Sequence, residues 1–134
     1  MIGDTKAVII LSGGMDSVTT LAYAIKKGFV CYALTFDYGQ KSKSEIKAAN
    51  YFADYFKCEE TKLFKIDFSN FSKSALTEKE MCVIDSSAEK IPSTYVPMRN
   101  IIFLSIACSW AESIKCNNIF VGANAIDYSG YPDC

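Results

Sequence analysis

Residues 12–19 combine two glycines, a carboxylate and several hydroxyl groups directly behind an apolar run. Gly13 and Gly14 permit backbone conformations closed to other residues, and they carry no side chain that would keep a ligand away. The successive N–H groups of such a loop can hold an anion, helped by the positive end of a helix that begins near Asp16 or Ser17. This stretch therefore favours the binding of a polyphosphate.

A simpler interpretation of the same residues is a tight turn followed by an ordinary helix N-cap. Serine and glycine are common turn residues, and Asp16 or Ser17 would then be the cap. The wider pattern favours the phosphate loop, because SGGMDS stands between the apolar run AVIIL and an amphipathic segment. The chain has neither the GxGxxG pattern of dinucleotide-binding loops nor the GxxxxGK[ST] pattern of the kinase type.

Other residues that suit substrate contacts stand near predicted strand and helix ends. Arg99 is the single arginine among 14 basic residues, and its planar cation suits a carboxylate or a phosphate. The stretches 37–40 (DYGQ) and 124–133 (NAIDYSGYPD) add carboxylate, amide and phenol groups. The alternatives are a surface arginine, an ordinary turn at 37–39, packing tyrosines, and aspartates that cap helices or face solvent.

Composition narrows the chemistry further. Half of the 134 residues are apolar and the net charge is −1, so neither disorder nor a general attraction to nucleic acid or acidic membranes is indicated. The chain has no histidine, the commonest general base and metal ligand. Its six cysteines form no CxxC pair, and we interpret Cys31 and Cys108 as small buried hydrophobes. We expect a cytoplasmic protein with neither nucleic acid nor membrane as a partner.

Alternating strands and helices must position these residues. Apolar runs predict strands over 6–11, 29–36, 61–67 and 118–123. Helical spacing predicts three helices: one that ends near Gly28, one that follows a capping-box pattern at 42–45, and one that covers 98–115. This order indicates an α/β, doubly wound parallel sheet in one domain over 1–134. Ligands of such sheets bind at the carboxyl ends of the strands, where the glycines fall. Residues 68–97 are expected to be a mobile loop or lid, with a short helix possible at 74–82.

Four stretches together resemble a known enzyme family: SGGMDSVTT (12–20), LTFDYGQKSKSE (34–45), YVPMRN (95–100) and GANAIDYSGYPDC (122–134). The first matches the loop of the PP-loop ATP pyrophosphatases, which have a Rossmann-like fold of the adenine nucleotide alpha hydrolase type. All four resemble the 7-cyano-7-deazaguanine synthases of queuosine biosynthesis, nearly end to end. Met98 stands where that family usually has glycine, and Lys41 and Ser42 stand where Arg-His is common, so their roles stay open.

The resemblance implies an ATP-dependent ligase that converts 7-carboxy-7-deazaguanine and ammonia to a nitrile through adenylated carboxylate and amide intermediates, releasing AMP and pyrophosphate. It implies catalytic roles for Asp16, Ser17 and Arg99. The residues implied in ATP binding are Leu11, Ser12, Gly13, Gly14, Met15, Asp16, Ser17, Val18 and Thr19. Those implied in substrate binding are Tyr38, Gln40, Arg99, Asn100, Asn124, Asp127 and Tyr128.

The resemblance also implies Mg²⁺, a homodimer and a structural Zn²⁺ held by four cysteines. The chain stops before the cysteine region of the family, so we expect no metal ligand in these 134 residues and a natural protein that continues past Cys134 with CxxC-type spacing. The 134 residues alone are expected to bind ATP weakly at most, carry no zinc and make no nitrile. The alternatives are another PP-loop adenylating enzyme, of the tRNA-thiolation or amidotransferase type, and a non-catalytic ATP-binding module.

Overall fold

Strands and helices alternate along residues 5–39, 43–68 and 99–123, the part of the chain that this computed structural model describes. The elements are, in chain order, β1 (Lys6–Ile10), α1 (Met15–Lys26), β2 (Val30–Asp37), α2 (Ser44–Tyr55), β3 (Glu60–Lys65), α3 (Arg99–Ser113) and β4 (Ile119–Phe120). The strands form one sheet in the order β3-β2-β1-β4, and all neighbours in it are parallel. The predicted α/β fold with a parallel sheet is confirmed.

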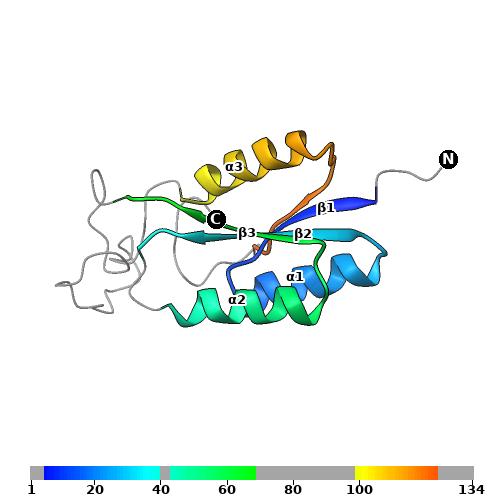
Figure 1. Ribbon diagram of the computed structural model, residues 1–134, viewed down its shortest axis with the longest axis horizontal. Coiled ribbons are helices and arrows are strands. Elements are labelled where there is room, and N and C mark those ends of the chain that lie inside the picture. Colours follow the sequence, from blue (N-terminus) through cyan, green and yellow to red (C-terminus); the bar gives the residue numbers. More distant parts are fainter. Residues whose placement is uncertain (1–4, 40–42, 69–98, 124–134) are drawn as a thin grey trace, which may run out of the picture.

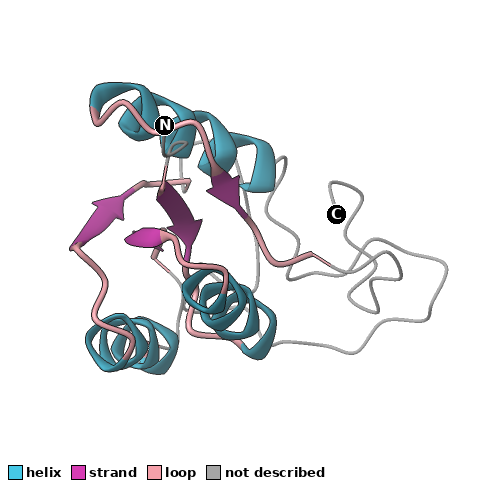
Figure 2. Cartoon of the chain, turned by 90° about the vertical axis from the view of Figure 1, so that its right-hand side faces the viewer, coloured by secondary structure: helices cyan, strands magenta, loops and turns pink. Residues whose placement is uncertain are grey.

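Helices cover both faces of the sheet, with α1 and α2 on one side and α3 on the other (Figure 1). Figure 2, turned by 90°, shows the same three layers. Alternate residues of a strand point to opposite faces, so Val8 and Ile10 pack in the cluster beneath α3. Ala7 and Ile9 pack in the cluster beneath α1 and α2. A strand buried on both faces needs the continuous apolar run that β1 has.

Aromatic contacts hold α3 over β2. The ring of Phe103 stacks on Phe36, with centroids 3.9 Å apart and planes 4° from parallel. Further along the helix, Trp110 meets Tyr32 edge to face at 6.0 Å. These two contacts fix the helix along the strand. Arg99, the first residue of α3, therefore has a defined place relative to the end of β2.

The start of α2 differs from the predicted capping box at 42–45. The first helical residue is Ser44 and the N-cap is Lys43, which makes no side-chain cap hydrogen bond. Lysine has no hydrogen-bond acceptor, and the Lys43 amine contacts the carboxylate of Asp37 instead. The predicted cap is therefore wrong, and the N-cap residue instead forms an ion pair with the last residue of β2.

The fourth strand is much shorter than the predicted 118–123. It consists of Ile119 and Phe120, which pair with Val8 and Ile9 of β1 and are half-buried rather than enclosed on both faces. Beyond them the chain reaches Gly122, which lies against the first turn of α1. The chain after Phe120 thus lies against α1, and its pairing with β1 ends at that residue.

The two cysteines interpreted as buried differ in the structure. Cys31 is buried in β2, as predicted, whereas Cys108 is exposed. The buried residues of α3 are Phe103, Ala107, Trp110 and Ala111. This spacing of four, three and one residues defines one side of the helix, and Cys108 lies off it. The prediction failed for Cys108 because α3 is apolar beyond the stripe that contacts the sheet.

The predicted loop at 68–97 begins inside the core. Phe68 is buried, with its ring centroid 6.3 Å from that of Tyr38 and 6.5 Å from that of Phe103. Residues 69–97, with the possible helix at 74–82, lie outside the described residues. None of the helices in the described ranges is long and apolar enough to cross a membrane.

Candidate functional site

The glycine loop, defined here as residues 11–14, leaves the sheet at the end of β1 and enters α1. Leu11 is fully buried, and its N–H donates to the carbonyl oxygen of Leu34 on β2 at 2.8 Å. Gly13 has a φ of +88°, and a Cβ there would lie 2.1 Å from the carbonyl oxygen of Glu45 on α2. Only glycine fits this position, because its backbone is left-handed and α2 touches it.

Ser17 supports the loop from inside. Its hydroxyl donates to the Gly14 carbonyl oxygen at 3.0 Å and accepts from the Ser12 N–H at 3.1 Å. The Ser12 hydroxyl lies 3.1 Å from the Ser17 hydroxyl and accepts from the Gly14 N–H at 3.2 Å. Ser17 is buried and Ser12 is exposed. The hydroxyl that faces solvent at this loop is therefore that of Ser12.

Helix α1 begins at Met15 with Gly14 as its N-cap, so the interpretation of Asp16 or Ser17 as the cap is wrong. Glycine has no side chain, and no side-chain cap hydrogen bond forms at this residue. The first N–H groups of a helix have no partner within the helix, and their positive end attracts anions. Asp16 lies in this first turn with its side chain exposed. The loop and the helix start together have the character of a phosphate site.

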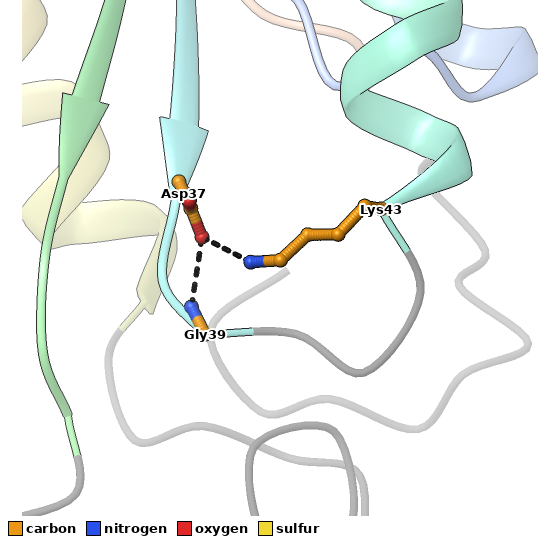
Figure 3. A network of polar contacts seen from close by, with 3 residues as sticks. All are labelled: Asp37, Gly39 and Lys43. Carbon is orange, nitrogen blue, oxygen red and sulfur yellow. Dashed lines mark hydrogen bonds and ion pairs between the residues drawn. The ribbon is translucent and has the colours of Figure 1, made fainter.

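The segment after β2 forms a turn held by Asp37 (Figure 3). The Asp37 Oδ1 accepts the Gly39 N–H at 3.2 Å and the Lys43 Nζ at 2.6 Å. The hydrogen bond from Lys43 lowers the pKa of Asp37 below its ordinary value, and the Gly39 N–H acts in the same direction. Asp37 therefore stays ionised and orders the turn that carries Tyr38.

Two of the predicted substrate residues meet at the start of α3. The Arg99 Nη1 donates to the Tyr38 hydroxyl at 3.1 Å, and the guanidinium carbon lies 5.4 Å from the centre of the Tyr38 ring. The Tyr38 ring is buried against Phe68 and Phe103. The tyrosine thus holds a cation in place beside the end of β2, and the next residue, Asn100, is half-buried.

A shallow hollow of about 300 Å³ lies at the carboxyl ends of β2 and β3. It is lined by Asp37, Tyr38, Gly39, Lys65, Ile66 and Asp67. Neither Lys65 nor Asp67 is among the predicted site residues. Both stand near the end of the strand predicted over 61–67, and that position was the signal that could have found them, because parallel strands bring such residues to one edge.

Gly122 opens the stretch 122–134 and is not among the predicted site residues. A Cβ at this position would lie 2.7 Å from the Asp16 carbonyl oxygen and 2.9 Å from the Thr20 hydroxyl. The chain that follows β4 therefore passes directly over the first turn of α1. Two residues later in the sequence comes Asn124, one of the predicted substrate residues.

The predicted residues divide into three groups. Those of the glycine loop and the start of α1 are brought together at the end of β1. In this group, Val18 packs its side chain toward the core, and Met15 is exposed. The Thr19 hydroxyl donates to the Met15 carbonyl oxygen. Tyr38, Arg99 and Asn100 gather beside the neighbouring strand, β2. Gln40, Asn124, Asp127 and Tyr128 lie outside the described residues, as do Lys41, Ser42 and Met98.

Burial makes two of the cysteines poor nucleophiles. It raises the pKa of Cys31 to about 12 and that of Cys58 to about 11, so both thiols stay protonated near neutral pH. Within residues 5–39, 43–68 and 99–123, no three histidine, cysteine, aspartate or glutamate residues are grouped so that they could hold a metal ion.

Two solved structures have a similar fold. One is a 4-thiouridine synthetase in complex with RNA and bound ATP. The match covers 87% of this chain and 29% of the synthetase chain (TM-score 0.57, 20% identity). Another is the NH3-dependent NAD synthetase from Campylobacter jejuni, with 92% and 49% coverage (TM-score 0.58, 17% identity). At these identities the likeness concerns the fold alone. The chain has the fold of the PP-loop ATP pyrophosphatases.

The particular family follows from sequence. The chain belongs to the family of the queuosine biosynthesis protein QueC, whose model matches residues 6–134. It is 55% identical over 130 residues to the 7-cyano-7-deazaguanine synthase of Ruthia magnifica and 53% identical over 132 residues to that of Thermoplasma volcanium. Both alignments cover 96% of this chain but only 56% and 54% of the relatives. The chain thus spans about half the length of the curated relatives it matches.

Proposed function

We propose that the protein, in its natural form, catalyses the ATP-dependent formation of 7-cyano-7-deazaguanine from 7-carboxy-7-deazaguanine and ammonia. The observation that carries this proposal is the glycine loop, which leads into a helix without a side-chain cap in a chain of this family. The chain spans only about half the length of its curated relatives, so the activity of the whole protein is a proposal.

The chemistry requires activation of an unreactive carboxylate. Transfer of AMP to a carboxylate oxygen releases pyrophosphate and turns that oxygen into part of a good leaving group. Ammonia then displaces AMP and gives the amide. A second ATP adenylates the amide oxygen, and loss of AMP with two protons leaves the nitrile. Each step depends on positioning and charge neutralisation more than on a strong base, which suits a chain without histidine.

The described residues suit these tasks in different ways. The glycine loop and the first turn of α1 would bind the β and γ phosphates, which leave as pyrophosphate, with the exposed Ser12 hydroxyl as an additional donor. Arg99, held by Tyr38, would bind the substrate carboxylate or the phosphate of the adenylate. Asn100 stands next to it on α3, and the proposed roles of Gln40, Asn124, Asp127 and Tyr128 rest on the family resemblance.

Magnesium would accompany ATP and neutralise the charge that develops on pyrophosphate. Asp16 carries a carboxylate, the ligand type that Mg²⁺ prefers, in the first turn of α1. For zinc the described residues do not fit, because no three potential ligands are grouped among them. We derive no step through zinc. Ammonia as the nitrogen source and a homodimer are parts of the same proposal.

The test is a product assay with the natural protein, expressed from its complete gene. Purified protein is incubated with Mg·ATP, ammonium and 7-carboxy-7-deazaguanine, and AMP, pyrophosphate and deazapurines are measured by mass spectrometry. We expect the nitrile, with the amide as an earlier intermediate, and no nitrile when ammonium is omitted. A protein that binds ATP but forms neither amide nor nitrile would contradict the proposed activity and favour a non-catalytic module. Sulfur transfer to tRNA would favour the thiolation type.

A further inference from the structure

Two buried hydroxyl side chains lie beneath the glycine loop. Ser17 and Thr35 are the buried serine and threonine of the described residues, with exposed fractions of 6% and 1%. A buried hydroxyl is unfavourable unless it is hydrogen-bonded. Both of these hydroxyls donate to backbone carbonyl oxygens at the two ends of the loop.

Thr35 reaches the loop from the neighbouring strand. Its Oγ1 donates to the carbonyl oxygen of Leu11 at 2.8 Å, and the Leu11 N–H donates to Leu34 on the same strand at 2.8 Å. Both polar groups of Leu11 are thus bound to β2, and Leu11 itself is fully buried. The peptide that leads into Ser12 is therefore held at its carbonyl end.

The orientation of these carbonyl groups affects what the loop can bind. A carbonyl oxygen carries a partial negative charge and repels phosphate, whereas an N–H attracts it. Thr35 binds the Leu11 carbonyl and Ser17 binds the Gly14 carbonyl, so both oxygens are directed into the protein. A loop with these groups turned inward presents less negative charge to an anion.

We propose that Thr35 is a positioning residue for the glycine loop, and that it acts through Leu11 to keep the loop in its anion-binding conformation. This inference rests on the proposed role of the loop in binding ATP. Thr35 itself is buried. It acts from the second strand, far from the SGGMDS pattern in sequence, and neither the motif nor the family comparison assigns it a role.

The test compares three substitutions in the natural protein. Thr35→Val keeps the shape of the side chain and removes the donor, and Thr35→Ser keeps the donor and removes a methyl group. Thr61→Val is the matched control, because Thr61 is an exposed threonine in the next strand, β3. The measurements are the dissociation constants of Mg·ATP and of pyrophosphate by calorimetry, and the thermal midpoint of each variant.

We expect Thr35→Val to bind both ligands about tenfold more weakly at temperatures well below its thermal midpoint. The reason is that a buried carbonyl loses its partner and the loop can turn. Thr35→Ser is expected to bind within about twofold of the wild type, since it keeps that hydrogen bond. Thr61→Val is expected to bind like the wild type. If Thr35→Val does not fold, Thr35→Cys replaces it, because the thiol is a weak donor of similar size, and the same loss of affinity is expected.

The outcomes separate this inference from the proposed function. A folded Thr35→Val protein with wild-type affinity for both ligands overturns the positioning role, and so does a Thr35→Ser protein as weak as Thr35→Val. A wild-type protein that binds neither ATP nor pyrophosphate overturns both the inference and the loop's role. A wild-type protein that binds ATP without making nitrile contradicts only the proposed reaction, while the comparison of the variants still decides the role of Thr35.

Discussion

At the residue scale, Asp16 is the carboxylate that we propose acts on ATP. It is exposed in the first turn of α1, so its removal costs little packing. We expect Asp16→Ala to abolish AMP formation and to leave the thermal midpoint unchanged. The matched control is Asp54→Ala, which removes an exposed aspartate from the last turn of α2. AMP release is measured by chromatography, and a well-folded Asp16→Ala enzyme with near-wild-type turnover would remove Asp16 from the mechanism.

Arg99 is expected to act through the geometry of its guanidinium. One of its nitrogens is bound to the Tyr38 hydroxyl, and the planar group keeps other N–H donors that lysine lacks. We expect Arg99→Lys to lower kcat/KM at least about tenfold, since a hydrogen bond to a charged group contributes roughly 1.5–3 kcal/mol. Tyr38→Phe keeps the ring beneath the cation and removes only the hydroxyl, so a smaller loss is expected. Unchanged steady-state kinetics for Arg99→Lys would make Arg99 an ordinary surface charge.

The ion pair between Asp37 and Lys43 has a consequence for pH dependence. A folded-state pKa below the ordinary value means that the pair stabilises the protein at pH values above about 4, and that this contribution is lost as the pH falls through the folded pKa. We expect Lys43→Met to raise the pKa of Asp37, and carboxyl NMR measures this pKa. We also expect it to unfold more easily than the wild type near pH 6, with a smaller difference near pH 2.5.

The control for this prediction is Lys62→Met, which removes the amine of the exposed pair with Glu60 on β3. It is expected to leave the pKa of Asp37 unchanged. If the pKa of Asp37 is the same in Lys43→Met as in the wild type, the contact with Lys43 does not hold the turn after β2.

At the element scale, the contact of Gly122 links the end of β4 to the first turn of α1, which is part of the proposed nucleotide site. A Cβ at 2.7 Å from the Asp16 carbonyl oxygen requires the helix start or the following chain to shift. We expect Gly122→Ala to lower kcat at least about tenfold, because small misplacements of reacting groups are costly. The measurement is steady-state turnover together with thermal unfolding.

Gly28 provides the matched control for this glycine. Its φ of +92° disfavours alanine, but a Cβ there meets nothing within 4 Å. Gly28→Ala is therefore expected to cost about 1 kcal/mol of stability and to leave turnover per folded molecule unchanged. Wild-type turnover in a folded Gly122→Ala protein would mean that the contact does not position the site.

Helices and strands were predicted well where the spacing of apolar residues indicates them. Details that depend on tertiary contacts were predicted less well. The apolar run of β1 predicted the strand, and the glycines behind it predicted the loop that leads into α1. The cap of α2 was mispredicted because the Lys43–Asp37 pair crosses a loop. Cys108 was mispredicted because the buried stripe of α3 depends on how the aromatic residues seat the helix.

The supporting residues of the site were the hardest to predict. The contacts of Thr35 with Leu11 and of Gly122 with the first turn of α1 join residues distant in sequence, and Lys65 lines the hollow from a neighbouring strand. Tyr38 and Arg99 were proposed separately as substrate contacts, but their hydrogen bond to one another depends on the seating of α3 over β2. Pairing of this kind requires the folded structure.

At the scale of the whole molecule, the parallel sheet brings two candidate subsites to adjacent strands. The glycine loop follows β1 and the Tyr38–Arg99 pair lies beside the end of β2, and these strands are neighbours. An enzyme that transfers AMP from ATP to a carboxylate must hold both molecules side by side. The arrangement therefore agrees with a reaction in which the α-phosphate of ATP meets an oxygen of the second substrate.

The most direct test of that claim follows the substrate oxygens. The natural protein is given 7-carboxy-7-deazaguanine with ¹⁸O in both carboxylate oxygens, together with Mg·ATP and ammonium, and AMP is analysed by mass spectrometry. Adenylation of first the acid and then the amide predicts two AMP for each nitrile, each AMP carrying one ¹⁸O atom in its phosphate, and unlabelled pyrophosphate. Nitrile formation accompanied by unlabelled AMP, or by ADP and labelled phosphate, would contradict the account.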